Sequence, residues 1–361
     1  MPSRSGHTSN VTARPLRIGI DAHAIGERKT GNERFVANLI PALREICDHE
    51  LILYFTNPEA ARAWAGRDGA VVRLLRPGHP VVRIPLILPY RAARDGVDVL
   101  LVQYTAPPVT SCPVVTVVHD VAYARFPQYY SRSDRLWMRR TIPFTMRRAA
   151  GVITVSEFSK REIVRVHGID PAKVTVAHNG VDPVFLDASP RLSPIEPPFF
   201  LAVGNLQPRK NLATLVRAYR RLVERKPDLP ERLVIAGQEW YDAETLHRET
   251  SDLRASGRLL FTGYAADEAV VGLLQRATAF AYPSVYEGFG LPPVEAMAVG
   301  APTLVSDIPV MREVVGDGAL RLPARDEEAW TQALLRVATD DRLRSDLTRR
   351  GRERAAGLRD E

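Results

Sequence analysis

Two glutamates bracket a glycine-containing turn in the last quarter of the chain. Glu287 and Glu295 are separated by seven residues, and Gly288 and Gly290 lie between them. Glycine leaves backbone amides open to phosphate oxygens, and carboxylates accept hydrogen bonds from hydroxyl groups. The stretch therefore suits a ligand that carries both phosphates and hydroxyls.

The elements around this turn are predicted from its flanks. An apolar run over residues 278–282 predicts a strand, and the proline pair 292–293 suits the first turn of a helix that ends at Gly300. Amides at a helix start attract anions. Glu295 would lie in that first turn, where the helix dipole alone favours a carboxylate by roughly 0.3–1 kcal/mol. A capping role therefore stays open for Glu295, whereas Glu287 lies outside the predicted helix and has no such role available.

A basic pair, Arg209 and Lys210, follows the apolar run 199–203 and precedes a helical pattern over 212–222. Cationic side chains that converge with helix amides can hold a diphosphate, although such a pair can also be a solvated corner. His119 follows the run 114–118, at the edge where parallel sheets bind ligands. By its position alone, a histidine at a strand end is more often structural.

Apolar runs that predict strands alternate with helical patterns along the chain. The alternation indicates an α/β protein with two Rossmann-like, doubly wound parallel sheets. The predicted strands are 16–22, 51–55, 71–75, 97–102, 114–118, 151–155, 174–177, 199–203, 233–236, 259–261 and 278–282. The main predicted helices are 35–43, 212–222, 243–253, 268–274 and a charged helical region from 326 on.

The length of 361 residues suggests two domains. Residues 187–198 are proline-rich and are predicted to be a linker. The first domain then spans 16–186, after a polar tail at 1–15 expected to be disordered, and the second spans 199–361. We expect the two domains to face each other across a cleft.

Composition and charge limit the partners, location and metal sites that the sequence allows. The formal charge of +7 allows nucleic acid, a membrane surface or an anionic substrate as partner. Cys47 and Cys112 show no metal-ligand spacing, and neither a signal peptide nor a long apolar run is recognised, so a cytoplasmic protein is expected. Without an Asp-X-Asp triplet or a His/Cys cluster, no metal site is predicted.

The motif EGFGLPPVEAM resembles the nucleotide-sugar site of glycosyltransferase family 4, whose members are retaining enzymes of the GT-B fold. The likeness extends from RIGIDAHA near the start to PARDEEAW near the end. It implies that Glu287 contacts the transferred sugar and Glu295 the nucleotide ribose. The amides of Phe289, Gly290 and Leu291 would then lie near the sugar and phosphates.

Three further segments resemble the same family. TGNER is similar to its TGxxR segment, which implies that the Gly31 amide approaches the donor diphosphate, although a helix start that happens to contain a glycine fits as well. VVHD is similar to its catalytic motif, in which His119 would contact the sugar. PRKN implies that Arg209 and Lys210 neutralise the leaving diphosphate, without the arginine that many members carry where this chain has Asn205. The helix with which members usually cross back onto the first domain is expected to be short or missing.

The resemblance implies a metal-independent, retaining hexosyltransferase that needs no cofactor besides its nucleotide diphosphate sugar. The first expectation for the donor is GDP-mannose, and for the acceptor a lipid-linked or glycan hydroxyl in surface polysaccharide or glycolipid assembly. Two alternatives stay open. One is a GT-B nucleotide-sugar epimerase or phosphorylase, and the other is a non-catalytic subunit that only binds nucleotide sugar.

An arginine-rich segment spans residues 130–150. It holds six arginines against one acid, Asp134, a local net charge of +5, together with bulky apolar residues such as Trp137. Pro143 is expected to kink or break any helix there. The segment is either a packed helix with solvated arginines or a peripheral contact with anionic lipid at the inner face of the membrane. No nucleic-acid module is recognised, so nucleic acid is not an expected partner.

Overall fold

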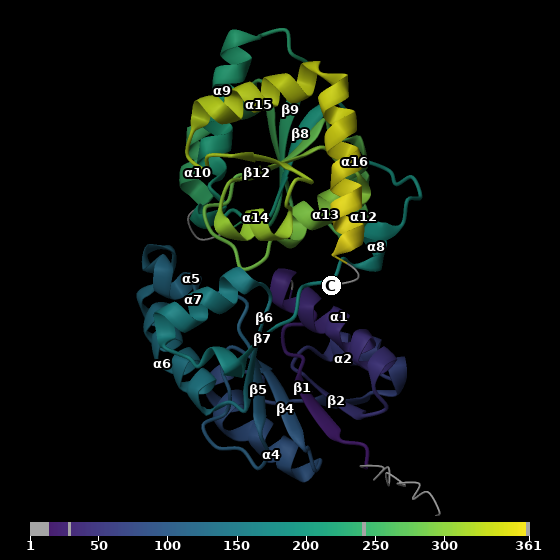
Figure 1. Cartoon of the computed structure of the whole chain (residues 1–361), viewed down its shortest axis with the longest axis vertical. Coiled ribbons are helices and arrows are strands. Elements are labelled where there is room, and N and C mark those ends of the chain that lie inside the picture. The colour runs from purple at the N-terminus through teal and green to yellow at the C-terminus, as the bar shows by residue number, and fades with distance from the viewer. Residues whose placement is uncertain (1–13, 28–29, 240–242, 359–361) are drawn as a thin grey trace, which may run out of the picture. The chain divides into compact units, whose positions relative to one another are not determined.

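Two parallel β-sheets organise the chain, and helices alternate with their strands (Figure 1). The computed structural model describes residues 14–27, 30–239 and 243–358. Most of the predicted tail at 1–15 therefore lies outside the described residues. The predicted α/β class with two Rossmann-like sheets is confirmed.

Two compact units make up the chain. One holds the residues up to Thr116 together with 148–150, and the other holds 117–147 together with the residues from Gly151 onward. The predicted linker region, 187–198, contains no helix or strand.

Seven strands form the first sheet in the order β3-β2-β1-β4-β5-β6-β7. β1 pairs in parallel with both β2 and β4, so the strand order reverses between β1 and β4. The strands are β1 (Arg17–Asp21), β2 (Glu50–Phe55), β3 (Val71–Leu74), β4 (Val99–Gln103), β5 (Val114–Val117), β6 (Gly151–Thr154) and β7 (Val174–Val176).

Six strands form the second sheet in the order β10-β9-β8-β11-β12-β13. β8 pairs in parallel with β9 on one side and with β11 on the other, so the order reverses between β8 and β11. The strands are β8 (Phe199–Val203), β9 (Arg232–Ala236), β10 (Leu259–Gly263), β11 (Ala279–Tyr282), β12 (Thr303–Ser306) and β13 (Leu320–Leu322).

Helices connect the strands. In the first half of the chain they are α1 (Thr30–Ile46), α2 (Pro58–Trp64), α3 (Pro80–Val82), η2 (Arg83–Ile87), α4 (Leu88–Arg94), α5 (Ala122–Arg125), α6 (Arg132–Arg148), α7 (Glu157–His167) and α8 (Pro183–Leu186). In the second half they are α9 (Leu212–Arg225), α10 (Ala243–Glu249), α11 (Ser251–Ala255), α12 (Asp267–Arg276), α13 (Leu291–Val299), α14 (Pro309–Val314), α15 (Glu327–Thr339) and α16 (Asp341–Gly357). Short turns add η1 (Arg67–Gly69), η3 (Pro127–Tyr129), η4 (Pro171–Lys173) and η5 (Pro208–Lys210).

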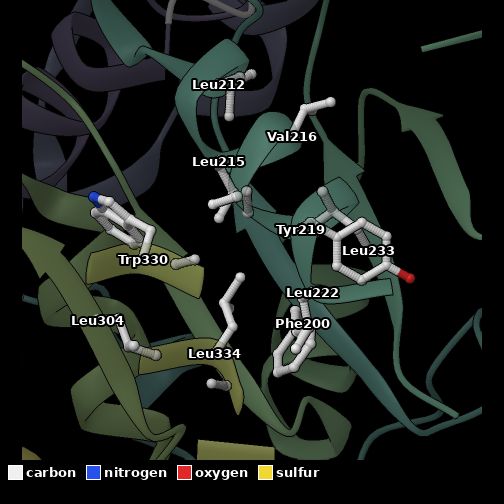
Figure 2. Packing of buried hydrophobic residues seen from close by; sticks show 14 of the residues in the cluster. Phe200, Leu212, Leu215, Val216, Tyr219, Leu222, Leu233, Leu304, Trp330 and Leu334 are labelled. Atoms are coloured by element: carbon white, nitrogen blue, oxygen red, sulfur yellow. The ribbon is translucent and has the colours of Figure 1, made fainter. Parts of the chain in front are cut away.

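The core of the second sheet explains why α9 and α15 form where they do. Apolar residues recur three and four positions apart on α9, so one face of this helix is buried against the sheet. Trp330 of α15 is fully buried in the same core, which Figure 2 shows with Tyr219 of α9 and Phe200 of β8. Burial of each large apolar side chain contributes about 1.5–3 kcal/mol. This packing holds the strands whose carboxyl ends carry the candidate site.

A buried ion pair lies at the carboxyl end of β1. Arg83 Nη1 donates to Asp21 Oδ2 at 2.6 Å, and both side chains are only 2% exposed. His23 Nδ1 lies 3.1 Å from the other carboxylate oxygen. Burial would raise the pKa of Asp21, but His23 and Arg83 together lower it well below its ordinary value.

Three local features differ from the predictions, and at Pro143 it is the predicted break that is wrong. α6 runs through Pro143 without a break, because Pro143 and its neighbours Ile142, Thr145 and Met146 are buried and their packing outweighs the lost hydrogen bond. The helix predicted over 243–253 is two helices, α10 and α11. Two strands, β12 and β13, were not predicted, and they contain only four and three residues.

Candidate active site

The candidate site lies where the strand order of the second sheet reverses. The loops after β8 and β11 leave adjacent parallel strands at their carboxyl ends, and the chain then continues in opposite directions across the sheet. Such a reversal opens a crevice in which α/β proteins bind ligands. Arg209 and Lys210 belong to the first loop and Glu287 to the second, so the structure brings these three predicted site residues together.

Glu287 is held by two cations at once. Arg209 Nη1 donates to Glu287 Oε2 at 2.6 Å, and Lys210 Nζ donates to Glu287 Oε1 at 2.7 Å. Tyr282, the last residue of β11, accepts a hydrogen bond from Lys210 Nζ at 2.6 Å and donates one to Glu287 Oε1 at 2.8 Å. We call these four side chains the Glu287 cluster.

The Glu287 cluster carries more positive than negative charge. The side chains of Arg209, Lys210 and Glu287 are 13%, 12% and 8% exposed. Burial would raise the pKa of Glu287, but Arg209 and Lys210 outweigh it and lower the pKa to about 2. Burial lowers the pKa of Lys210 despite the opposing attraction of Glu287. Glu287 thus contacts both cations, and Asp120 is a second carboxylate whose charge also acts on Arg209 and Lys210.

Arg209 also has unused donor capacity. Its Nη1 makes a second hydrogen bond, at 2.7 Å, to the carbonyl of Tyr286, but its Nε is buried without a partner among the described residues. A buried donor without a partner is costly, typically 1–3 kcal/mol. A ligand oxygen would offset this cost.

Close backbone contacts fix the two loops. A side chain at Gly237 would place its Cβ 1.9 Å from the carbonyl oxygen of Gly204, so only glycine permits this approach. Asn211 adopts a left-handed conformation with φ of 54°, and its Nδ2 donates to the carbonyls of Pro283 and Ala324 at 3.0 and 2.6 Å. The amide side chain therefore ties the loop after β8 to the loop after β11.

The helix after the glycine turn begins earlier than predicted. Gly290 caps α13 in a left-handed conformation with φ of 104°, so α13 begins at Leu291 and has no acidic residue in its first turn. Glu295 lies in the second turn and is 2% exposed. The helix-dipole explanation for Glu295 is therefore wrong, and its burial needs another reason. The first amides of α13, which begin at Leu291, have no acceptor within the helix.

His119 lies beyond the end of β5 in the same unit as the Glu287 cluster. Its carbonyl accepts a hydrogen bond from Ser159 Oγ, which also donates to the carbonyl of Gly288. Any side chain at Gly288 would collide with the His119 carbonyl, since the added Cβ would lie 2.3 Å from that oxygen. Burial lowers the pKa of His119 to about 4, so its imidazole is neutral at pH 7.

Gly31 lies in the first turn of α1, in the other unit, and is exposed. A Cβ at this position would meet no atom within 4 Å, so the surrounding structure does not require glycine there.

Sequence reasoning missed the role of Tyr282 in the Glu287 cluster. Its place as the last residue of a predicted strand beside the glycine turn was the available signal.

The described residues hold neither a metal-binding group nor a membrane-spanning helix. Among the described residues, no group of three or more His, Cys, Asp or Glu side chains is arranged to hold a metal ion. In the same part of the chain, no helix combines the length and hydrophobicity that crossing a bilayer requires.

The two-sheet architecture is that of the GT-B glycosyltransferases. A crystal structure of HepE from Anabaena in complex with UDP-glucose matches with a TM-score of 0.69 over 96% of this chain and 97% of that chain, at 17% sequence identity. The family model described as Glycosyltransferase Family 4 matches residues 30–185, and the model described as Glycosyl transferases group 1 matches 187–354. The chain therefore belongs to glycosyltransferase family 4.

Relatives of this chain include bacterial mannosyltransferases and also glycogen synthases. O-antigen chain mannosyltransferase B of Escherichia coli is 30% identical over 246 residues, which are 66% of this chain and 64% of the relative. A phosphatidyl-myo-inositol mannosyltransferase of Mycolicibacterium smegmatis is 33% identical over 210 residues, 56% of this chain and 52% of the relative. The matches thus span between half and two thirds of the length of these relatives.

Proposed function

We propose that the protein is a retaining, metal-independent hexosyltransferase that moves a sugar from a nucleotide diphosphate sugar to an acceptor hydroxyl. The observation that carries this proposal is the pair of buried cations, Arg209 and Lys210, held on Glu287 at the strand reversal of the second sheet. Two fixed cations and an unused arginine donor can stabilise a diphosphate as it leaves, without a bound metal.

The reaction needs little acid or base chemistry from the protein. The bond between the anomeric carbon and the diphosphate oxygen breaks as the acceptor oxygen bonds to the same face of that carbon. The acceptor proton passes to the leaving phosphate oxygen, while Arg209 and Lys210 balance the growing negative charge. Glu287 orients the sugar and the two cations. The neutral His119 imidazole can hydrogen-bond to the sugar without adding charge.

The remaining predicted contacts complete the donor site. In this proposal Glu295 accepts hydrogen bonds from the ribose, and the amides of Phe289, Gly290 and Leu291 bind the sugar and phosphates at the start of α13. GDP-mannose is the proposed donor, and the similarity to mannosyltransferases supports mannose as the transferred sugar.

The proposed acceptor is a lipid-linked or glycan hydroxyl, reached at the inner face of a membrane by a cytoplasmic protein. Support comes from α6, where Leu136, Trp137 and Phe144 are 54%, 45% and 45% exposed. In the described structure no carboxylate pairs with Arg132, Arg135, Arg139, Arg140 or Arg147. Basic residues at an anionic surface are worth about 1 kcal/mol each, so α6 can bind such a membrane reversibly.

Donor hydrolysis tests the catalytic proposal. The protein is incubated in EDTA with GDP-mannose and a panel of other nucleotide sugars, and release of nucleoside diphosphate is followed. Slow hydrolysis of one donor is expected. Release of a free sugar phosphate would indicate a phosphorylase, an epimerised nucleotide sugar would indicate an epimerase, and tight binding without turnover would indicate a silent subunit.

Vesicle binding tests the membrane proposal. Arg139, Arg140, Arg147 and Arg148 are changed together to Ser, and co-sedimentation with anionic and neutral vesicles is measured at low and high salt. The control changes four arginines of α9 that have carboxylate or carbonyl partners, Arg217, Arg220, Arg221 and Arg225. Loss of anionic binding in the α6 variant alone is expected. Unchanged binding would contradict a lipid contact at α6.

A further inference from the structure

A second apolar surface lies in the other unit, on one continuous helical segment from Pro80 to Arg94. α3 and α4 are joined by η2, a π-helical turn. The amide of Leu88 donates to the carbonyl of Arg83, five residues back instead of the four of an α-helix. Residues five apart across this turn therefore fall on the same side of the segment.

The π turn aligns three exposed apolar side chains. Val81 lies on α3 and Leu86 lies five residues later in η2. Tyr90, on α4, follows Leu86 by four residues. Their side chains are 61%, 63% and 58% exposed. In an uninterrupted α-helix, Val81 would point away from the other two. We call these three residues the Val81 stripe.

The opposite side of the segment is anchored. Leu88 and Ala92 are buried in the core of the first sheet together with Ile52 and Leu100. Arg83, inside the π turn, makes the buried ion pair with Asp21 at the end of β1. The pair fixes which residues of the segment face the sheet and leaves the Val81 stripe turned outward.

The surroundings of the stripe are basic. From Arg76 to Arg94 the sequence has four arginines and no Asp or Glu. Arg83 forms an ion pair with Asp21, whereas no described carboxylate forms an ion pair with Arg76, Arg91 or Arg94. Arg94 Nη1 lies 3.3 Å from the Tyr90 hydroxyl, so a cation sits beside the stripe itself.

We propose that the Val81 stripe inserts into the headgroup region of an anionic membrane. This inference rests on the proposed function and deepens it, since it names a second element that contacts the membrane. Exposed Leu and Val pack against acyl chains, Tyr favours the membrane interface, and the flanking arginines pair with lipid phosphates. A second copy of the chain is a poorer occupant because it would bring one basic rim against another.

Vesicle binding of the double variant Leu86→Ser/Tyr90→Ser tests the proposal. The matched control is Leu192→Ser/Tyr264→Ser, which removes a leucine and a tyrosine that are 95% and 50% exposed elsewhere. Partition onto phosphatidylglycerol vesicles is measured at low salt and at ~1 M salt, where the screening length is about 3 Å. The stripe variant should bind at least about tenfold more weakly than the control at both salt concentrations, because apolar insertion is not screened.

Equal binding of the two double variants overturns the proposal. So does a dimer in light scattering that the stripe variant alone dissociates without a change in vesicle binding. Donor hydrolysis in vesicle-free solution is measured on the same preparations. If the wild type hydrolyses a donor and the stripe variant binds vesicles as well as the control does, only the stripe proposal is rejected. If the wild type hydrolyses no donor and the stripe variant binds vesicles more weakly than the control, only the transferase proposal is rejected.

Discussion

Two buried carboxylates illustrate two uses of charge in this protein. Asp21, at the end of β1, faces one permanent cation, Arg83, at 2.6 Å. Glu287, in the loop after β11, faces two cations, Arg209 and Lys210, at 2.6 and 2.7 Å. The first pair is balanced and positions a helical segment. The second cluster places two cations on one carboxylate at the strand reversal of the second sheet, where we propose that an anionic donor binds.

The largest expected effect is the loss of folding stability when the Asp21–Arg83 pair is broken. Asp21→Ala leaves the Arg83 guanidinium buried without its carboxylate and should lower the free energy of unfolding by about 3–5 kcal/mol. Urea denaturation provides the measurement. Arg73→Ala, which breaks the half-exposed pair of Arg73 with Asp95, is the control and should cost less than about 1 kcal/mol. Equal losses would erase the distinction between buried and exposed pairs.

Removal of the excess cation should affect turnover and leave the fold largely intact. Lys210→Ala leaves Glu287 paired with Arg209 alone, so that one carboxylate contacts one cation, as Asp21 contacts Arg83. We expect kcat to fall by roughly 10²–10³, the range for losing one preorganised electrostatic contact. Steady-state kinetics with the best donor, together with urea denaturation, checks this. A lower free energy of unfolding together with an unchanged kcat would show that Lys210 has a structural role instead.

Acid should weaken the Glu287 cluster in a defined range. The folded-state pKa of Glu287 is lowered to about 2 from 4.5, so its contribution to stability is complete above pH 4.5 and is lost as the pH falls through 2. The full contribution is on the order of 3 kcal/mol. Glu287→Gln should therefore show a flatter dependence of unfolding free energy on pH between 6 and 3. Parallel curves for variant and wild type would exclude the ionised cluster.

The smallest expected effect separates the two glutamates. Glu295→Gln should raise KM for nucleotide donors by about tenfold with little change in kcat, because it weakens a contact made equally in the ground and transition states. Glu287→Gln should mainly lower kcat, since it misplaces both the sugar and the two cations. Initial rates over a range of donor concentrations distinguish them. Identical profiles for both variants would contradict the separate roles.

The sequence predicted the strands that bring Arg209, Lys210 and Glu287 together better than it predicted the contacts elsewhere. Apolar runs located β8 and β11, and the basic pair and the glutamate that follow them are joined in the structure because adjacent parallel strands end at one edge. The Asp21 to Arg83 pair was not predicted, since its partners are 62 positions apart and share no local pattern. The same reason applies to α6, where tertiary packing around Pro143 overrides a local helix breaker.

Binding of nucleoside diphosphates tests the central claim most directly. Titration calorimetry in EDTA compares a nucleoside diphosphate with its monophosphate on wild type and Lys210→Ala, using the nucleotide of the hydrolysed donor. The diphosphate should bind the wild type at least about tenfold more tightly than the monophosphate, and Lys210→Ala should lose most of this difference. Equal affinities for the two nucleotides, or diphosphate binding that appears only after Mg²⁺ is added, would contradict a site whose excess cations hold the leaving diphosphate.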